Sequence, residues 1–517
     1  MHIKFNSMAA GIMLAAGAVA CNNDKITSLN DNPNNPVTAP PGPVFTQAVR
    51  TSAARFVGNG FSLRQTEFVA QHWAEVQYPD EDRYARLGPA DVQGTFNAAY
   101  YTEIEDLKKV IVTGLGGFGN NGVKNPAIYG PASILQTWDY EYLTDTWGDI
   151  PYSQSLTGDS VAPNFKPAYD TQKNVYTGML ATLTKATADM AAGPNGSGLS
   201  TADPIYSGSV AKWEKFSNSL RARLAMRMVN KDPATAAAQL TAAFSAPGGV
   251  FTSNADNAQF AWPGDNVYNN PITDNFVSRD DHRVSNTFAN ILVGNNDPRT
   301  PILMQPTEDD PTKYAGMPNG LTASDAGTYF TSSSRPGAIF FPGATTSGTF
   351  GTAANKKLPS FLMTYAELAF IQAEAAERGI GGLPGTAATY YYNGIRASMA
   401  QWGVTDATAI ATYLAQPAIA YQGGVAGQKQ IAVQKWIALV TDGPQSWAEW
   451  RRTCQPSTIA AGPAAVVSYV PRRFQYSTTE YSVNPDEVAK AVADQGPDTF
   501  ATRIWWDSAP AAAPTCQ

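Results

Sequence analysis

Segments of helical hydrophobic periodicity constrain the fold of this chain more than any other feature of its sequence. In the clearest segment, residues 209–230, apolar side chains recur at the spacing that aligns them along one face of a helix. This stripe consists of Trp213, Phe216, Leu220, Leu224 and Met228. Ser209 is a predicted N-cap, and Asp232-Pro233 ends this helix and begins the next.

Other segments have the same helical character. Residues 61–77 place Val69, Trp73 and Val76 at positions i, i+4 and i+7, on one face of a helix. The remaining segments are residues 92–111, 361–378, 385–402 and 426–452. We therefore predict an all-α scaffold of stacked helical hairpins, in which any strands are short and peripheral.

Residues 245–358 differ from the rest of the chain. Gly, Pro, Asn, Ser and Thr dominate there, aromatic residues are scattered, and no helical period is sustained. An ordered stretch this long without regular helices is unusual in a compact domain and is typically functional. We predict one helical domain over residues 44–517, interrupted by this loop-rich insertion.

The first twenty residues have the organisation of a secretory signal peptide. Lys4 supplies a positive start, and residues 8–20 are uncharged and shorter than the roughly 20 apolar residues that span a bilayer. The sequence before Cys21 resembles the lipobox of bacterial lipoproteins, with Ala18 where Leu is usual. We predict a signal peptide over residues 1–20, an acylated Cys21 and a polar tether over residues 21–43. The alternative is an ordinary signal peptide that leaves Cys21 unmodified.

Two further cysteines, Cys454 and Cys516, remain for disulfide chemistry. An oxidising envelope compartment permits a bridge between them, which would tie back the C-terminus and contribute about 4 kcal/mol in the chain-entropy model. The alternative is two free thiols, and the sequence does not decide between these possibilities.

Composition and motifs exclude several functions. A formal net charge of −7 argues against nucleic-acid binding, which requires clustered Lys and Arg. Only three histidines occur, which excludes a His-rich metal site and leaves little room for His-based catalysis. Residues 114–119 match G-x-G-x-x-G, but a predicted helix precedes them and no helix can begin at the third glycine, so we reject a dinucleotide site.

Aromatic residues on loops are the strongest candidates for ligand contact, because aromatic rings stack on sugar faces at a low entropy cost. The candidates are Tyr78, Tyr84, Trp262, Tyr268 and Trp73. Trp73 lies on the apolar stripe of its predicted helix, so the alternative for this residue is a place in the core.

Two acidic stretches, residues 80–82 and Asp280-Asp281, carry carboxylates of the kind that calcium prefers. Neither fits an EF-hand, and the alternative for both is a solvated acidic loop. We predict no cofactor and leave a structural calcium ion open. No pair among the 43 Asp and Glu residues stands out as the two carboxyl groups of a glycoside hydrolase.

Seven short segments of the chain form a characteristic ordered set. They are residues 143–152 (LTDTWGDIPY), 169–176 (YDTQKNVY), 212–221 (KWEKFSNSLR), 365–375 (YAELAFIQAEA), 434–439 (QKWIAL), 447–452 (WAEWRR) and 471–476 (PRRFQY). Together they resemble the SusD/RagB family of outer-membrane nutrient-binding lipoproteins. Each is weak alone, but they occur in the family's order and cover nearly the whole chain. The tether sequence at residues 32–36 (NPNNP) looks like the starch-binding-associated subgroup.

The resemblance implies a fold of tetratricopeptide-like hairpins with a ligand face formed by loops and the insertion. It implies an acyl-anchored protein on the outer face of the outer membrane that caps a SusC-type TonB-dependent transporter. The ligand would be an oligosaccharide or a peptide, bound and delivered without catalysis.

Two other classes of protein share parts of this pattern. A surface-anchored all-α glycoside hydrolase or lyase would have the same helices and aromatic residues. An adhesive repeat protein would use its concave face for contact with another protein.

Overall fold

Helix formation follows the sequence periodicity in most of the predicted segments. The computed structural model describes residues 39–117, 122–158, 162–193, 198–341 and 355–508. The clearest predicted helix is present as α9 (Val210–Arg227), and its apolar stripe is buried. Asp232 caps α10 (Pro233–Phe244) by accepting the N–H of Thr235, as expected. Ser209 occupies the N-cap position of α9 but makes no capping bond through its side chain within the described residues.

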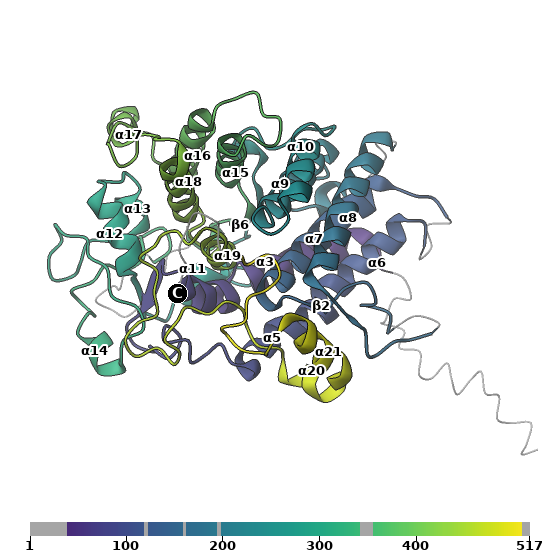
Figure 1. Ribbon diagram of the computed structural model, residues 1–517, viewed down its shortest axis with the longest axis horizontal. Coiled ribbons are helices and arrows are strands. Elements are labelled where there is room, and N and C mark those ends of the chain that lie inside the picture. Colours follow the sequence, from purple (N-terminus) through teal and green to yellow (C-terminus); the bar gives the residue numbers. More distant parts are fainter. Residues whose placement is uncertain (1–38, 118–121, 159–161, 194–197, 342–354, 509–517) are drawn as a thin grey trace, which may run out of the picture. The chain divides into compact units, whose positions relative to one another are not determined.

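The helices form a packed array, so the predicted all-α class with helical hairpins is confirmed (Figure 1). Each helix from α6 to α10 packs on the next one, and α15 extends the array by packing on α9, α16 and α18. In the first half the helices before α9 and α10 are α3 (Pro41–Phe56), the π-helix η1 (Asn59–Thr66), α4 (Glu67–Val69), α5 (Pro89–Ala99), the π-helix η2 (Tyr100–Ile104), α6 (Glu105–Gly114), α7 (Pro126–Trp147), α8 (Gln172–Ala192) and the 3-10 helix η3 (Ser200–Ala202). In the second half they are α15 (Tyr365–Glu377), α16 (Ala387–Gln401), α17 (Ala407–Leu414), α18 (Gly424–Ala438), α19 (Gly443–Thr453), α20 (Thr478–Val483) and α21 (Pro485–Gln495).

The insertion contains only short elements within its described residues, as its composition predicts. They are the 3-10 helix η4 (Asn254–Asp256), β4 (Ala258–Phe260), α11 (Pro271–Asn275), β5 (His282–Val284), α12 (Asn286–Gly294), α13 (Thr300–Leu303), α14 (Ala323–Gly327) and the 3-10 helix η5 (Asn355–Lys357). In Figure 1, α12, α13 and α14 lie at the opposite end of the helical array from α6 and α8.

Three two-stranded antiparallel sheets join parts of the chain that are distant in sequence. β1 (Trp73–Glu75) pairs with β5, β2 (Ile150–Pro151) pairs with β3 (Tyr169–Asp170), and β4 pairs with β6 (Ser360–Met363). The strands are short, as predicted, but β1 and β5 are buried at every position rather than peripheral.

The prediction of one helix over residues 61–77 is wrong in its second half. α4 ends at Val69, and Trp73 lies in β1. Local periodicity favours a helix here, but pairing with β5, which is far away in the sequence, gives the same apolar side chains a buried place on a strand.

Buried tryptophans dominate the core. Trp436, Trp447 and Trp450 are almost fully buried on α18 and α19, which confirms that these residues of the family-like segments pack between helices. The indole N–H of Trp436 donates to the Ala70 carbonyl at 3.0 Å, and that of Trp447 donates to the Pro471 carbonyl at 2.8 Å. Trp436 and Trp447 therefore each bury a large apolar surface without leaving the indole N–H unsatisfied.

A buried ionic cluster connects α15, α18 and α19. The Arg452 guanidinium donates to Glu374 Oε1 at 2.7 Å and to Glu449 Oε2 at 3.2 Å. Lys435 Nζ donates to the same Glu449 oxygen at 3.0 Å. The side chains of all four residues are at most 6% exposed, so each charge depends on its partners rather than on water.

The family-like segment at residues 143–152 is a helix end and turn, as its sequence suggests. α7 ends at Trp147, and the C-cap residue Gly148 has a φ of 85° and a ψ of −113°, which are accessible to glycine and strained for other residues. The side chain of Gln495 is pressed against this turn, where it accepts the N–H of Asp149 at 2.9 Å and donates to the Trp147 carbonyl at 3.1 Å. Asp149 in turn accepts the N–H of Gln172 at 2.7 Å, at the start of α8.

Replacing Gly148 with alanine is expected to destabilise the fold by about 2–4 kcal/mol, through backbone strain and steric overlap. A Cβ at this position would lie 1.6 Å from Gln495 Oε1, so Gln495 would have to leave both of its hydrogen bonds. The free energy of unfolding in urea measures the loss. Gly379→Ala is the control, because its φ is also positive, at 68°, but its Cβ would meet no described atom within 4 Å. Equal losses in the two variants would show that the contact with Gln495 contributes nothing.

The ends of the chain carry the remaining sequence predictions. Residues from Pro41 onward form one compact unit. Cys454 takes part in a disulfide, but Cys516 lies outside the described residues, and their pairing stays a prediction. Cys21 and the signal peptide also lie outside the described residues.

Candidate ligand-binding site

The pairing of β1 with β5 builds the base of the candidate site. In this antiparallel pair Trp73 lies opposite Val284, and Glu75 lies opposite His282. The pairing extends one step further, because the Val76 N–H donates to the Asp281 carbonyl at 2.8 Å. An early segment of the chain and the middle of the insertion are thus joined at one place.

The chain turns outward directly after β1, and a buried carboxylate holds this turn. Glu75 Oε1 accepts the backbone N–H groups of Gln77 at 3.2 Å and Tyr78 at 3.1 Å. The carbonyl of Tyr78 accepts the N–H of Glu81, which continues the turn. As a result, the Tyr78 side chain is 51% exposed although Glu75 beside it is fully buried.

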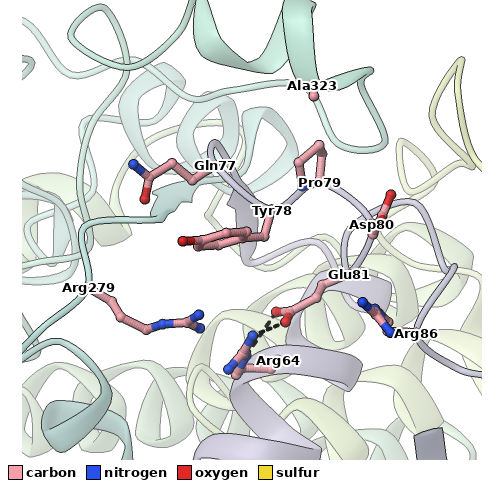
Figure 2. Close-up of a pocket in the computed structure, with 9 residues that line it drawn as sticks. All are labelled: Arg64, Gln77, Tyr78, Pro79, Asp80, Glu81, Arg86, Arg279 and Ala323. Atoms are coloured by element: carbon pink, nitrogen blue, oxygen red, sulfur yellow. Dashed lines mark hydrogen bonds and ion pairs between the residues drawn. The ribbon is translucent and has the colours of Figure 1, made fainter.

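A pocket of about 410 Å³ opens beside this turn (Figure 2). Its lining residues come from η1, from the turn after β1, from the segment before β5 and from α14. They are Arg64, Gln77, Tyr78, Pro79, Asp80, Glu81, Arg86, Arg279 and Ala323. Figure 2 shows the Tyr78 ring and the Arg64 and Arg279 guanidinium groups turned toward the same space.

Ion pairs hold the charged side chains of the pocket in place. Arg64 makes two bonds with the Glu81 carboxylate, one of them from Nε at 3.0 Å, and this forked geometry restricts both side chains. The Arg279 guanidinium lies 5.0 Å from the centre of the Tyr78 ring and 3.2 Å from Asp281 Oδ2. The pocket therefore presents an aromatic ring, guanidinium donors and carboxylate acceptors within one hollow, which is a suitable combination for a ligand rich in hydroxyl groups.

Ionisable groups lie buried beneath the pocket. Burial raises the pKa of Glu75 to about 8 and that of Asp82 to about 7. Burial by itself lowers the pKa of His282, but the neighbouring Glu75 and Asp281 carboxylates raise it above its ordinary value. Asp82 Oδ1 accepts the side-chain N–H of Asn319 at 2.7 Å, which fixes the turn to the insertion.

The structure separates the aromatic candidates into two groups. Tyr78 lines the pocket, and Tyr268 is 42% exposed elsewhere, with the Arg50 guanidinium 5.0 Å from its ring centre. Trp73, Tyr84 and Trp262 are 0%, 2% and 4% exposed, so these three rings are core residues rather than a surface for stacking.

Trp262 stands in a loop-like sequence that suggests an exposed ring, but its ring is buried. The indole N–H donates to Ser360 Oγ at 2.9 Å, and the ring packs edge-on against Phe260. Pairing of β4 with β6 covers this part of the insertion, and that contact joins residues that are far apart in the chain. The Gly- and Pro-rich sequence around Trp262 does not indicate that a distant strand buries this segment.

Ion pairs and burial hold most carboxylates of the two acidic stretches, and the Asp80 side chain is 57% exposed. Asp80 pairs with Arg83 at 3.2 Å, and Asp280 pairs with Arg335 at 2.7 Å. Asp82 and Asp281 are each 1% exposed. The two stretches nevertheless meet beneath the same pocket, which neither stretch indicates by itself.

The cationic part of the site was not predicted from the sequence. Arg64 lies in η1, where helical periodicity carries no sign of a binding role, and Arg279 comes from the insertion. Arg279 stands next to the Asp280-Asp281 pair in the sequence, and that is the only signal that could have drawn attention to it.

The comparison with protein families identifies the class of protein. The chain matches the SusD-like family described as "Starch-binding associating with outer membrane" over residues 33–477, and it belongs to that family. The predicted resemblance is therefore confirmed, and members of this family are binding proteins associated with the outer membrane. No protein with a curated description matches the sequence. Among the described residues, none forms a helix of the length and apolar character needed to cross a membrane.

Solved structures share the fold over most of the chain. A protein described as chitin-binding is 24% identical with a TM-score of 0.76, and the match covers 90% of this chain and 100% of the other. A chitin-binding SusD homologue from Flavobacterium johnsoniae is 25% identical with a TM-score of 0.73, covering 91% and 98%. A SusD homologue from Bacteroides vulgatus is 23% identical with a TM-score of 0.75, covering 90% and 97%.

Proposed function

We propose that the protein is a surface lipoprotein that captures glycan and delivers it, chemically unchanged, to a SusC-type TonB-dependent transporter. The observation that carries the proposal is the family match over residues 33–477. The pocket beside Tyr78 supports it, because it combines an exposed aromatic ring with firmly held charged groups.

Glycan is the ligand class that this pocket favours over peptide. Hydroxyl groups of a sugar can accept from Arg64 and Arg279 and donate to Asp80 and Glu81, while an apolar sugar face stacks on Tyr78. The relatives described as chitin-binding and the starch-binding description of the family name the first two glycan types to test.

Delivery requires the protein to stay at the membrane beside its transporter. Acylation at Cys21 supplies the anchor, each buried CH₂ of the acyl chains contributing about 0.8 kcal/mol. The polar tether that follows Cys21 leaves the helical unit outside the bilayer, where it caps the transporter barrel.

The test compares binding with turnover on the same glycans. The purified protein is titrated with chito-oligosaccharides and malto-oligosaccharides by calorimetry, and the mixtures are then held for a day and examined by mass spectrometry. We expect saturable binding of at least one series and no new product. Cleavage of a bound glycan would contradict the proposal and favour the surface-anchored glycoside hydrolase or lyase.

Purification of the natively acylated protein from detergent-solubilised outer membrane checks the delivery step. A TonB-dependent barrel in near-equal amount is the expected result. Recovery of the protein alone would contradict delivery and leave only glycan binding.

A further inference from the structure

Three ionisable side chains converge in the protein interior beneath the pocket. Glu75, Asp281 and His282 each direct a potential metal-binding atom toward the other two, and these atoms all lie within 4.8 Å of one another. His282 Nδ1 is 2.8 Å from Asp281 Oδ1 and 3.6 Å from Glu75 Oε2. Each of the three residues is at most 1% exposed. Two donor atoms that each lie about 2.0–2.2 Å from one ion are roughly 3–3.5 Å from each other. The two distances from His282 Nδ1 are close to this range.

One carboxylate oxygen in this cluster is without a hydrogen bond. Glu75 Oε1 is satisfied by two backbone N–H groups, but Glu75 Oε2, which faces His282, has no hydrogen-bond partner among the described residues. A buried carboxylate oxygen normally accepts at least one hydrogen bond, since burying it unpaired costs free energy. A cation between Glu75 and His282 would satisfy it.

Aromatic rings enclose the cluster and separate it from bulk solvent. The His282 ring stacks against Phe68 at 5.1 Å and meets the edges of Phe276 and Trp73 at 5.3 and 6.0 Å. These rings cover the cluster with apolar surface. The pocket lined by Tyr78 and Arg279 lies beside the turn that follows β1.

The second buried histidine of the described chain shows how such a residue is satisfied without a metal. His72 Nδ1 is 2.6 Å from Glu67 Oε2, and His72 Nε2 is 3.0 Å from the Trp436 carbonyl. His72 thus meets one carboxylate and one carbonyl, and both ring nitrogens are used. His282 meets two carboxylates through the same nitrogen, while its Nε2 has no hydrogen-bond partner among the described residues.

We propose that Glu75, Asp281 and His282 form a binding site for one divalent transition-metal ion of the Zn²⁺ or Mn²⁺ class. Two carboxylates and a neutral imidazole carry a charge of −2, which a divalent cation neutralises. His282 Nδ1 is the binding nitrogen, and the imidazole proton then resides on Nε2. The nitrogen donor separates this site from a calcium site, because calcium takes oxygen ligands, whereas imidazole suits zinc and its neighbours.

The ion would stabilise two parts of the pocket lining, which are the turn that carries Tyr78 and the segment that carries Arg279. Glu75 holds the backbone of Gln77 and Tyr78 through its other oxygen, and Asp281 lies 3.2 Å from Arg279. Metal binding at this site does not depend on the proposed glycan function, so each can fail without the other.

The test measures metal binding to the detergent-solubilised full chain, purified without a polyhistidine tag and stripped with a chelator. Calorimetric titration with Zn²⁺, and separately with Mn²⁺ followed by electron paramagnetic resonance, should show one ion per chain. Glu75→Gln and His282→Gln should weaken binding about 100-fold or more, because the first removes a negative charge and the second removes the imidazole nitrogen. His72→Gln is the matched control and should leave binding unchanged.

A measurement on the unaltered protein covers the case in which a buried substitution prevents folding. X-ray absorption at the zinc edge should report a single imidazole with oxygen ligands. Failure of the unaltered protein to bind one ion would overturn the proposal, and so would equal binding by a folded His282→Gln variant or the absence of an imidazole ligand in the spectrum.

Discussion

Tyr78→Ala is expected to weaken glycan binding by about 1–3 kcal/mol, or roughly 5- to 150-fold in Kd, the loss typical of an aromatic anchor. The side chain is 51% exposed at the pocket, and its ring is already positioned by Glu75 below and Arg279 beside it. A ligand therefore stacks on the ring without the cost of ordering it first. Calorimetry with the glycan that binds most tightly measures the change.

Tyr268→Ala is the matched control for this prediction. Tyr268 is also exposed, at 42%, and also has an arginine 5.0 Å from its ring centre, but it does not line the pocket. Its removal should leave affinity within about twofold of the unaltered protein, a change of roughly 0.4 kcal/mol. If Tyr268→Ala lowers affinity and Tyr78→Ala does not, the binding site lies at the insertion loop rather than at this pocket.

Arg452→Met is expected to destabilise the fold by about 3–5 kcal/mol, because it leaves buried carboxylates without their main cation. Glu374 and Glu449 share Arg452. After the substitution Glu449 keeps only Lys435, and Glu374 keeps only the partly exposed Arg378. The free energy of unfolding in urea measures the loss, with circular dichroism used to confirm that the variant is folded.

The loss should also depend on pH. Burial by itself raises the pKa of Glu449, but the charges of Arg452 and Lys435 hold it well below its ordinary value. Stability from this lowered pKa is present above the unfolded carboxyl pKa of about 4.3 and is lost as the pH falls toward the folded pKa. The difference between Arg452→Met and the unaltered protein should therefore be larger at about pH 7 than at about pH 4.

Lys185→Met serves as the control for a surface ion pair. Lys185 binds Asp189 one helical turn away, and its side chain is 72% exposed. Water solvates both charges after the substitution, so we expect a loss of about 0–0.5 kcal/mol. A loss of less than about 1 kcal/mol in Arg452→Met would contradict the role assigned to the buried cluster.

Helical periodicity predicted the scaffold correctly wherever neighbours along the helix decide the structure. α9 and the cap of α10 follow from residue spacing, because side chains three and four positions apart lie on one helix face. The same reasoning failed for Trp73, where pairing with β5 overrides the local preference.

The exposure of the candidate aromatic residues was harder to predict than the helices. Tyr78 and Trp262 both stand in loop-like sequence, and only the contacts of Trp262 with Phe260 and Ser360 distinguish the buried ring from the exposed one. Exposure depends on which distant segment covers a loop, and a single sequence does not contain that information.

The sequence by itself determined the helical class and the family, because both depend on patterns within short segments of the chain. Only the tertiary structure decided the pocket, in which Tyr78 and Arg64 from early elements meet Arg279 from the insertion. The cluster of Glu75, Asp281 and His282 beneath it likewise forms where β1 pairs with β5. The physical reason is the separation along the chain between the residues in contact. Helices form through contacts a few residues apart, whereas this site is assembled by strand pairing and ion pairs between segments that meet only after folding.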